Sequence, residues 1–142
     1  MSQTSIPPVL RQQIAKRDRF RCCYCPTLEA ITGAYFTIDH ILPEALGGQT
    51  TLDNLCLACW PCNLPKAKRI VAVDLEINEV VRLFHPTQQR WHENFAWSAD
   101  GLLIIGLTPT GRATITALRL NAPEQVNGRR IWIEAGRHPP ST

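Results

Sequence analysis

The chain has 142 residues, of which 44% are hydrophobic and 19% charged, so its composition excludes a disordered protein and fits one domain or a small domain with an appendage. The net charge of +3 comes from residues 1–70, which carry eight Lys and Arg against five Asp and Glu, and this excess is compatible with an anionic partner. No run approaches the ~18 apolar residues of a membrane span and no signal peptide is visible, so we expect a cytoplasmic protein without membrane contact.

The first part of the chain is expected to contain a tail, a helix and a strand. Residues 1–8 read as a loose tail, and apolar residues at helical spacing predict a helix over 9–20. The opposite face of this helix is basic, and the pattern leaves open whether it is solvated or contacts phosphate. Residues rich in β-formers predict a strand over 32–41, with Asp39 and His40 at or near its end.

The remaining elements are predicted from apolar patterning and from turn residues. A turn is expected at Asn78, within the alternating pattern of 73–84, and another at Asp100-Gly101. Thr110 is the expected cap of the helix that follows. The other expected elements are a loop or short helical turn at 51–57, a helix that follows Asn63 and runs to about Val71, a hairpin at 95–107, and helices at 110–121 and 125–135.

Four cysteines form two Cys-x-x-Cys pairs with 33 residues between them, Cys22 with Cys25 and Cys59 with Cys62. The two-residue gap lets both sulfurs of a pair face one Zn²⁺ ion, which takes four thiolates in a tetrahedral site. Buried free thiols or a redox pair are the alternatives, and the presence of two pairs favours zinc. Four thiolates leave no open position on the ion, so this zinc would be structural. Cys23 and Cys56 fall outside these two Cys-x-x-Cys pairs, and we expect them to be small apolar residues that fill space in the core.

Residues suited to binding a metal or moving a proton lie between and beside the cysteine pairs. Asp39 offers a hard oxygen ligand suited to Mg²⁺ or Mn²⁺, and the imidazole of His40 could take a proton from water near neutral pH. On a strand these neighbours would point to opposite faces, so they share a site only if the strand bends or ends there. Asn63 follows Cys62, so a zinc ion would fix its backbone, and its amide oxygen could be a second ligand.

This stretch resembles the HNH endonucleases, which are ββα-metal (His-Me finger) nucleases. The resemblance covers about residues 20–70 and includes the intervals of 14 residues from His40 to Asn54 and of 9 from Asn54 to Asn63. Flanking Cys-x-x-Cys pairs mark a common zinc-containing subclass, and residues 73–142 look like the tail of small stand-alone bacterial members. The matching motifs are Asp-His-Ile-Leu-Pro at 39–43, Gly47-Gly48, Asp53-Asn54, and Cys-x-x-Cys-Asn followed by Lys66.

The resemblance implies an α+β fold with a ββα-metal core on a four-cysteine zinc site, an N-terminal helix, and a C-terminal extension of a hairpin plus helices. It implies a nuclease domain over residues 1–72 and an extension of unassigned role over 73–142, packed on that domain. It also implies a metal-dependent endonuclease that hydrolyses DNA phosphodiester bonds with one Mg²⁺ or Mn²⁺ ion. Its partner would be nucleic acid, with DNA favoured, and the pattern does not indicate an oligomeric state.

The resemblance implies a role for each matching residue. His40 corresponds to the general base that activates water, and Asp39 to the carboxylate that binds the catalytic metal ion. Asn54 corresponds to the residue that braces the loop and orients the histidine. Asn63 stands where many members have histidine, and either side chain can offer a lone pair to the metal. Candidate nucleic-acid contacts are Lys66, Lys68 and Arg69, which match basic positions near the scissile phosphate, together with Arg19 and Arg21 from the basic run.

Two other functions compete with the nuclease. A zinc-stabilised nucleic-acid-binding module without catalysis would keep the four cysteines but would not need Asp39, His40 and Asn63 together. An interaction domain that uses residues 73–142 is the weaker alternative, because the apolar residues there suit core packing. Three further histidines have no such neighbours and are expected to be ordinary surface or core residues, His85, His92 and His138.

Overall fold

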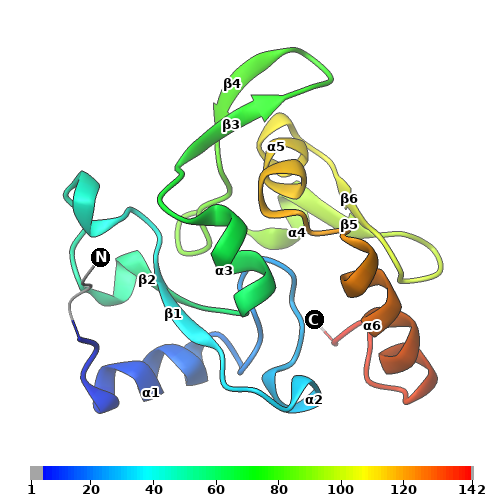
Figure 1. Ribbon diagram of the computed structural model, residues 1–142, viewed down its shortest axis with the longest axis horizontal. Coiled ribbons are helices and arrows are strands. Elements are labelled where there is room, and N and C mark those ends of the chain that lie inside the picture. Colours follow the sequence, from blue (N-terminus) through cyan, green and yellow to red (C-terminus); the bar gives the residue numbers. More distant parts are fainter. Residues whose placement is uncertain (1–4, 142) are drawn as a thin grey trace.

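The computed structural model describes residues 5–141 and contains three two-stranded antiparallel sheets with helices between and around them (Figure 1). The combination of helices with small antiparallel sheets confirms the expected α+β class. No helix within residues 5–141 has the length and apolar character that crossing a membrane requires. The elements are α1 Pro8–Arg17, α2 Glu29–Thr32, β1 Thr37–His40, the 3-10 turns Glu44–Leu46 and Leu52–Asn54, β2 Leu55–Ala58, α3 Trp60–Lys66, β3 Val71–Asp74, β4 Glu79–Arg82, α4 Trp91–Asn94, β5 Phe95–Trp97, β6 Ile104–Gly106, α5 Pro109–Leu118 and α6 Pro123–Glu134.

Strands β1 and β2 pair antiparallel, and α3 follows and contacts β1, which gives a ββα unit. The sequence predicted β1, although the strand is shorter than 32–41, but it did not predict β2. A loop or short helical turn was expected over 51–57, and only Leu52–Asn54 adopts it. All four residues of β2 are buried, so their apolar run has no alternation that would mark a strand.

Helix α3 differs from the expected helix at both ends. It begins at Trp60 rather than after Asn63, because Pro61 fits the first turn of a helix, where the missing amide has no partner to lose. It ends at Lys66 rather than near residue 71, and Ala67 takes a positive φ of 49° that cannot continue a right-handed helix.

Helix α1 ends three residues before the predicted end at Phe20. Arg19 and Phe20 have φ values of 57° and 55°, so the chain leaves the helix in the left-handed conformation. The tail predicted at residues 1–8 falls partly outside the described residues, and Pro8 is already the first residue of α1.

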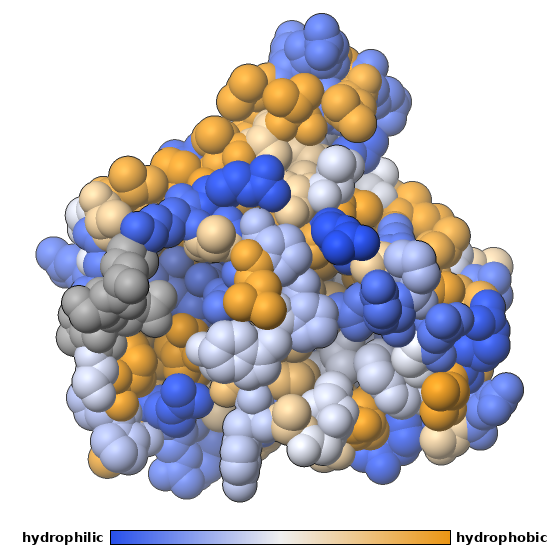
Figure 2. All heavy atoms as spheres, viewed as in Figure 1, coloured by the Kyte–Doolittle hydropathy of each residue, from blue (hydrophilic) through white to orange (hydrophobic). Residues whose placement is uncertain are grey.

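The second half of the chain forms a projecting ribbon and a hairpin that packs on helices. Strands β3 and β4 form the ribbon, with Asn78 at a positive φ in its turn as expected. Figure 1 shows this ribbon extending from the body of the molecule, and Figure 2 shows apolar side chains gathered on it, of which Leu75 and Val80 are among the exposed ones. Strands β5 and β6 form the hairpin predicted at 95–107.

Two details of this half differ from the prediction. Thr108, not Thr110, caps α5, since its hydroxyl oxygen accepts a hydrogen bond from the Gly111 amide at 3.0 Å. Pro109 occupies the start of the helix, so the cap lies before it. The short helix α4 was not predicted.

Apolar residues from both halves of the chain share one buried cluster. It contains Leu55 and Leu57 of β2 together with Phe84, Phe95 and Leu118 from the second half. The cysteine pairs belong to the same cluster, so the packing of residues 73–142 is continuous with the metal-ligand region.

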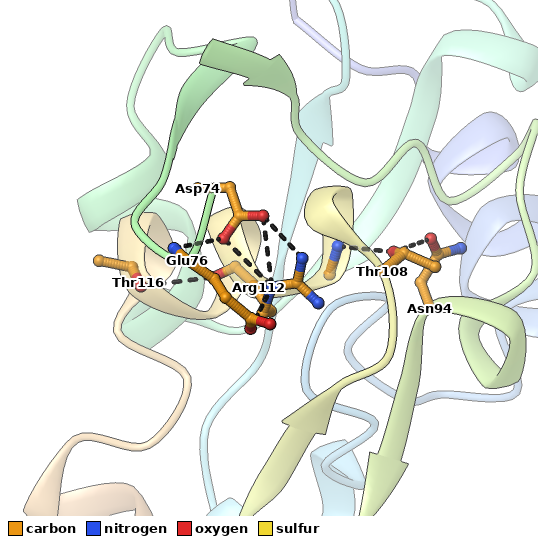
Figure 3. Close-up of polar contacts among 7 residues, drawn as sticks. Asp74, Glu76, Asn94, Thr108, Arg112 and Thr116 are labelled. Atoms are coloured by element: carbon orange, nitrogen blue, oxygen red, sulfur yellow. Dashed lines mark hydrogen bonds and ion pairs between the residues drawn. The ribbon is translucent and has the colours of Figure 1, made fainter. Parts of the chain in front are cut away.

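An ion pair between β3 and α5 anchors the ribbon (Figure 3). Arg112 contacts the buried carboxylate of Asp74 at 2.8 Å and the exposed carboxylate of Glu76 at 2.9 Å. Beside it, the Thr108 hydroxyl donates to Asn94 Oδ1 at 2.7 Å, which joins α5 to α4. The hydrogen bond from Arg112 lowers the pKa of Asp74.

We expect the Asp74–Arg112 pair to make the fold acid-sensitive. A lowered folded-state pKa stabilises the protein above the ordinary value near 3.8, and this stabilisation is lost as the pH falls through the lower folded-state value. Urea unfolding of wild type and Asp74→Asn should therefore differ most at neutral pH and converge on acidification. Glu124→Gln, which removes an exposed carboxylate, serves as the control, and a constant difference across the acid range would contradict the expectation.

Candidate active site and metal centre

The four cysteines of the two pairs meet in the core. Their sulfur atoms all lie within 4.8 Å of one another, and Cys25 Sγ is 3.6 Å from Cys59 Sγ. Sulfurs on a tetrahedral zinc with Zn–S bonds of about 2.3 Å are about 3.8 Å apart, so this cluster is compatible with a structural zinc ion. Among residues 5–141, no second group of three or more His, Cys, Asp or Glu ligands is assembled in this way.

Local backbone geometry explains how the cysteines converge. The amides of Tyr24 and Cys25 donate to Cys22 Sγ at 3.4 and 3.5 Å, which turns the first pair around its sulfur. Cys59 is the N-cap of α3 and Cys62 lies in its first turn, so the second pair faces the same point. The other two cysteines lie outside the cluster, as the two-residue spacing indicates.

Crowding of the four thiols shifts their acidity. Hydrogen bonds from Cys22, Cys59 and Cys62 lower the pKa of Cys25 well below the ordinary thiol value. The pKa of Cys62 is raised, chiefly through hydrogen bonding to Cys22 and Cys25. Ionisation of all four thiols at this spacing needs a cation among them.

The extension places a buried cation near this cluster. Arg129 of α6 is fully buried and donates to the carbonyl of Leu102 and to Asn121 Oδ1, both at 2.9 Å. Burial lowers the pKa of Arg129, and the nearby cysteines Cys25, Cys62 and Cys59 oppose that shift electrostatically. A zinc ion with four thiolates carries two net negative charges, which the guanidinium would partly offset.

His40 is the last residue of β1, and its buried ring is held on one side only. Nε2 lies 3.0 Å from Thr50 Oγ1 and 3.6 Å from Glu44 Oε1. Nδ1 is buried and has no hydrogen-bond partner among the described residues. If Nε2 carries the proton and donates it toward Thr50 and Glu44, then Nδ1 is left with a lone pair.

Asp39 belongs to a different hydrogen-bond network from its neighbour. Its Oδ2 accepts from the Tyr24 hydroxyl at 2.7 Å and lies 3.0 Å from Lys66 Nζ, while His40 contacts the loop of residues 44–50. Burial is the main cause that raises the pKa of Tyr24, so its hydroxyl stays protonated and donates to the carboxylate. Both of these contacts use Oδ2, which leaves Oδ1 outside them.

Lys66 differs from its predicted role at the surface. Its side chain is 2% exposed, and Nζ also donates to the Ile41 carbonyl at 3.2 Å. A phosphate contact needs an accessible ammonium group, whereas this ammonium lies inside the protein against Asp39. Helix α3 packs against β1, which places the side chain of its last residue beside Asp39.

Asn54 joins the two ends of the loop that follows β1. Its Oδ1 accepts from the Leu42 amide at 2.8 Å, and its Nδ2 donates to the carbonyls of Leu42 at 3.0 Å and Gln49 at 2.9 Å. Gly48 packs so closely that a Cβ there would lie 1.7 Å from the Leu42 carbonyl oxygen, so only glycine fits. This arrangement fixes the loop that carries Glu44 and Thr50 to His40.

The other predicted site residues are more dispersed. Asn63 is half-buried on α3, and among the described residues no hydrogen bond links its side chain to Asp39 or His40. Lys68 and Arg69 are exposed after α3, and Arg69 donates to the Ala117 carbonyl at 2.7 Å. Arg19 and Arg21, from the basic N-terminal run, lie elsewhere. They line a smaller cavity together with Trp91.

Part of the chain is similar to a known protein family. Residues 22–69 match the family model described as HNH endonuclease. These residues are similar to HNH endonucleases, and we call residues 22–69 the HNH segment. The match spans 48 of the 142 residues, and it contains every cysteine of the cluster and the ββα unit. No curated protein and no solved structure gave a significant match.

Three residues of the HNH segment contribute contacts that the sequence did not reveal. Tyr24 was not singled out, although its place between Cys22 and Cys25 fixes its backbone. Glu44 was also not considered, and its position four residues after His40 was the available signal. Thr50 offered no local signal, because only the fold of the loop brings it to the ring.

Replacing Lys66 by alanine should strongly destabilise the HNH segment. The change leaves Asp39 as a buried carboxylate without its cation, and breaking a buried pair in this way costs about 3–5 kcal/mol. Lys68→Ala removes the same charge from an exposed position and should change the stability by less than about 0.5 kcal/mol. Denaturant unfolding measures both, and similar losses for the two variants would refute the buried pair.

Proposed function

We propose that the protein is a metal-dependent endonuclease that hydrolyses DNA phosphodiester bonds with His40 as the general base. The family match supports a nuclease-type function for residues 22–69. The observation that carries the proposal is the state of the His40 ring, in which Nε2 is held by the loop and Nδ1 is buried without a partner among the described residues. Buried polar atoms are rarely left unpaired, so a water molecule bound to Nδ1 would satisfy this nitrogen and would be the nucleophile in the proposal.

The contacts of His40 suit proton transfer. The Nδ1 lone pair takes a proton from the attacking water, and Nε2–H, directed at Thr50 and Glu44, keeps the ring in that tautomer. The nearby Glu44 carboxylate stabilises the imidazolium that forms. Water oxygen bonds to phosphorus and the 3′-oxygen leaves, so the products carry 5′-phosphate and 3′-hydroxyl ends.

Asp39 and Asn63 are the residues that we propose to hold the catalytic ion. A carboxylate and an amide oxygen are the ligand types that Mg²⁺ and Mn²⁺ prefer, and Asp39 Oδ1 lies outside the contacts with Tyr24 and Lys66. A bound ion would supply charge neutralisation at the phosphate and at the leaving oxygen. In this proposal, Asn54 is a positioning residue, because it fixes the loop that orients His40.

We further propose that the four cysteines hold one zinc ion per chain and that it is structural. The nuclease domain would span residues 1–72, with residues 73–142 packed on it as an extension. Exposed Lys68 and Arg69 follow α3 and would contact the phosphate backbone. Arg19 and Arg21 belong to the proposal as more distant nucleic-acid contacts.

A second candidate function is a zinc-stabilised nucleic-acid-binding module without catalysis. The ion pair between Asp39 and Lys66 favours it, because an ammonium group 3.0 Å from the carboxylate already neutralises part of the charge that a metal would bind. This module would bind DNA but leave it intact.

Incubation with supercoiled plasmid separates the two functions. The proposal expects nicked or linear product with Mg²⁺ or Mn²⁺ and none with EDTA. Binding measured by gel shift without any cleavage, at every metal concentration, would favour the binding module. Failure of both cleavage and binding would reject a nucleic-acid function.

A further inference from the structure

A cavity outside the His40 network lies between the HNH segment and the extension. It measures about 630 Å³. One wall is the loop that Asn54 braces, and the opposite wall is the segment of residues 82–89, which starts at the end of β4. In sequence, one wall precedes α3 and β3 and the other follows them. Neither the family match nor the sequence analysis assigned a role to residues 82–89.

The wall at residues 82–89 is held in place by its own hydrogen bonds. The Thr87 hydroxyl donates to the carbonyl of Asp53 on the opposite wall, which links the extension to the loop that Asn54 braces, called here the HNH loop. The His85 amide donates to Gln89 Oε1 at 2.9 Å, so the amide nitrogen of Gln89 remains available as a donor. The cavity is therefore framed by two segments that are tied to each other.

The cavity combines cationic, amide and apolar surfaces. Arg82 is exposed at the end of β4, and its guanidinium has no hydrogen bond or ion pair within the described part of the chain. Apolar side chains line another part of the cavity, Ile41, Ile70 and Leu83. Amide side chains are supplied by both walls, Gln49 from the HNH loop with Gln88 and Gln89 from the extension.

His85 reports on the electrostatic character of the cavity. Burial lowers its pKa, and the positive charges of Arg82 and Lys66 lower it further against the opposing effect of Asp53. The Thr87 hydroxyl gives its proton to Asp53, so in the 3.2 Å contact His85 Nδ1 is the donor and Nε2 keeps its lone pair. Burial disfavours a charge of either sign, but the nearby positive charges of Arg82 and Lys66 favour an anion over a cation at this position.

We propose that this cavity binds one unpaired nucleotide of the nucleic-acid strand on which the protein acts, with its phosphate at Arg82 and its base among the amide side chains. The inference rests on the proposed nuclease function and gives residues 82–89 a role in substrate binding. An arginine guanidinium suits a phosphate, amide groups suit the polar edge of a base, and the apolar wall suits its face.

The size of the cavity argues for a single unpaired nucleotide. Its volume lies within the range of about 300–1,000 Å³ that is typical of pockets for one small ligand. A base that has left the stack can enter such a cavity, whereas a paired base stays within its helix. Binding of a single strand should therefore depend more on this cavity than binding of a duplex.

Binding measurements in a His40→Ala background test the proposal without cleavage of the probe. Fluorescence anisotropy would compare Arg82→Ala with Arg130→Ala, which removes the same charge from exposed α6. We expect Arg82→Ala to weaken binding of a labelled single-stranded DNA by about tenfold and to lower the salt slope by about one. Arg130→Ala should stay within about twofold of the parent. Gln88→Ala should weaken single-strand binding and leave duplex binding unchanged.

The outcomes test nucleotide binding in the cavity and the proposed nuclease function separately. Equal effects of Arg82→Ala and Arg130→Ala on the single strand would overturn the cavity, even if wild type cuts plasmid. Equal losses on single strand and duplex would reject the unpaired nucleotide. An Arg82-dependent single-strand affinity in a protein that cuts no DNA would reject the nuclease and retain the cavity. Competition by a free deoxynucleoside monophosphate would show whether the strand or the nucleotide alone is bound.

Discussion

Exchange of Cys22 for serine is expected to leave the protein without zinc and without a stable fold. Structural zinc contributes about 10–16 kcal/mol to the folding of zinc-finger peptides, which is as large as the roughly 5–15 kcal/mol that stabilises a whole domain. The four cysteines are at most 3% exposed and belong to the single buried cluster that joins both halves of the chain. Loss of the ion would therefore affect residues 73–142 as well as the HNH segment.

The neighbouring cysteine provides a matched control. Cys23→Ser makes the same chemical change one residue away, outside the four-sulfur cluster. Metal analysis should find about one zinc per chain in wild type and in Cys23→Ser, and none in Cys22→Ser. Circular dichroism with thermal unfolding would report the fold. A Cys22→Ser protein that keeps both its zinc and its unfolding midpoint would rule out the four-cysteine centre.

The cysteine frame could be predicted from sequence because ligand spacing is a local property. Two residues between cysteines are enough to direct both sulfurs of a pair to one point, whatever the rest of the fold does. The α+β class was predictable because the resemblance to the HNH endonucleases implies it. The turn at Asn78 also followed from a local preference, here for positive φ.

The contacts around Asp39 and His40 could not be predicted, because their partners Tyr24, Lys66 and Thr50 are distant in sequence and only the fold brings them together. Lys66 reaches Asp39 because α3 packs against β1, a long-range contact that the local sequence does not reveal. Strand β2 was missed because a fully buried run of four residues carries no periodic signal. The wall at residues 82–89 was missed because nothing in its own sequence places it against the HNH loop.

The structure connects the four cysteines to the proposed catalytic residues Asp39 and His40. Tyr24 lies within the first cysteine pair, and Lys66 ends the helix that begins at the second pair. Both residues contact Asp39 Oδ2. A metal ion in the cysteine cluster would thereby fix both partners of the carboxylate next to His40. Zinc loss should then disturb the site directly, in addition to lowering stability.

His40→Ala is expected to abolish nearly all cleavage while the protein stays folded and keeps its zinc. A positioned general base contributes about 10²–10⁴-fold to the rate, so the plasmid cleavage rate should fall by that factor. His92→Ala removes an exposed imidazole and should cut at the wild-type rate. Metal analysis and thermal unfolding of both variants would show that the loss is not a folding defect.

Added imidazole separates a base from a merely structural histidine. A small base that diffuses into the space left by His40→Ala can take the proton from water, so part of the rate should return as its concentration rises. Because the tautomer at Nδ1 depends on the contact of Nε2 with Thr50, Thr50→Val should also lower the rate, but by less than His40→Ala. Undiminished cleavage by His40→Ala would remove this residue as the base and direct attention to a base outside the HNH motif.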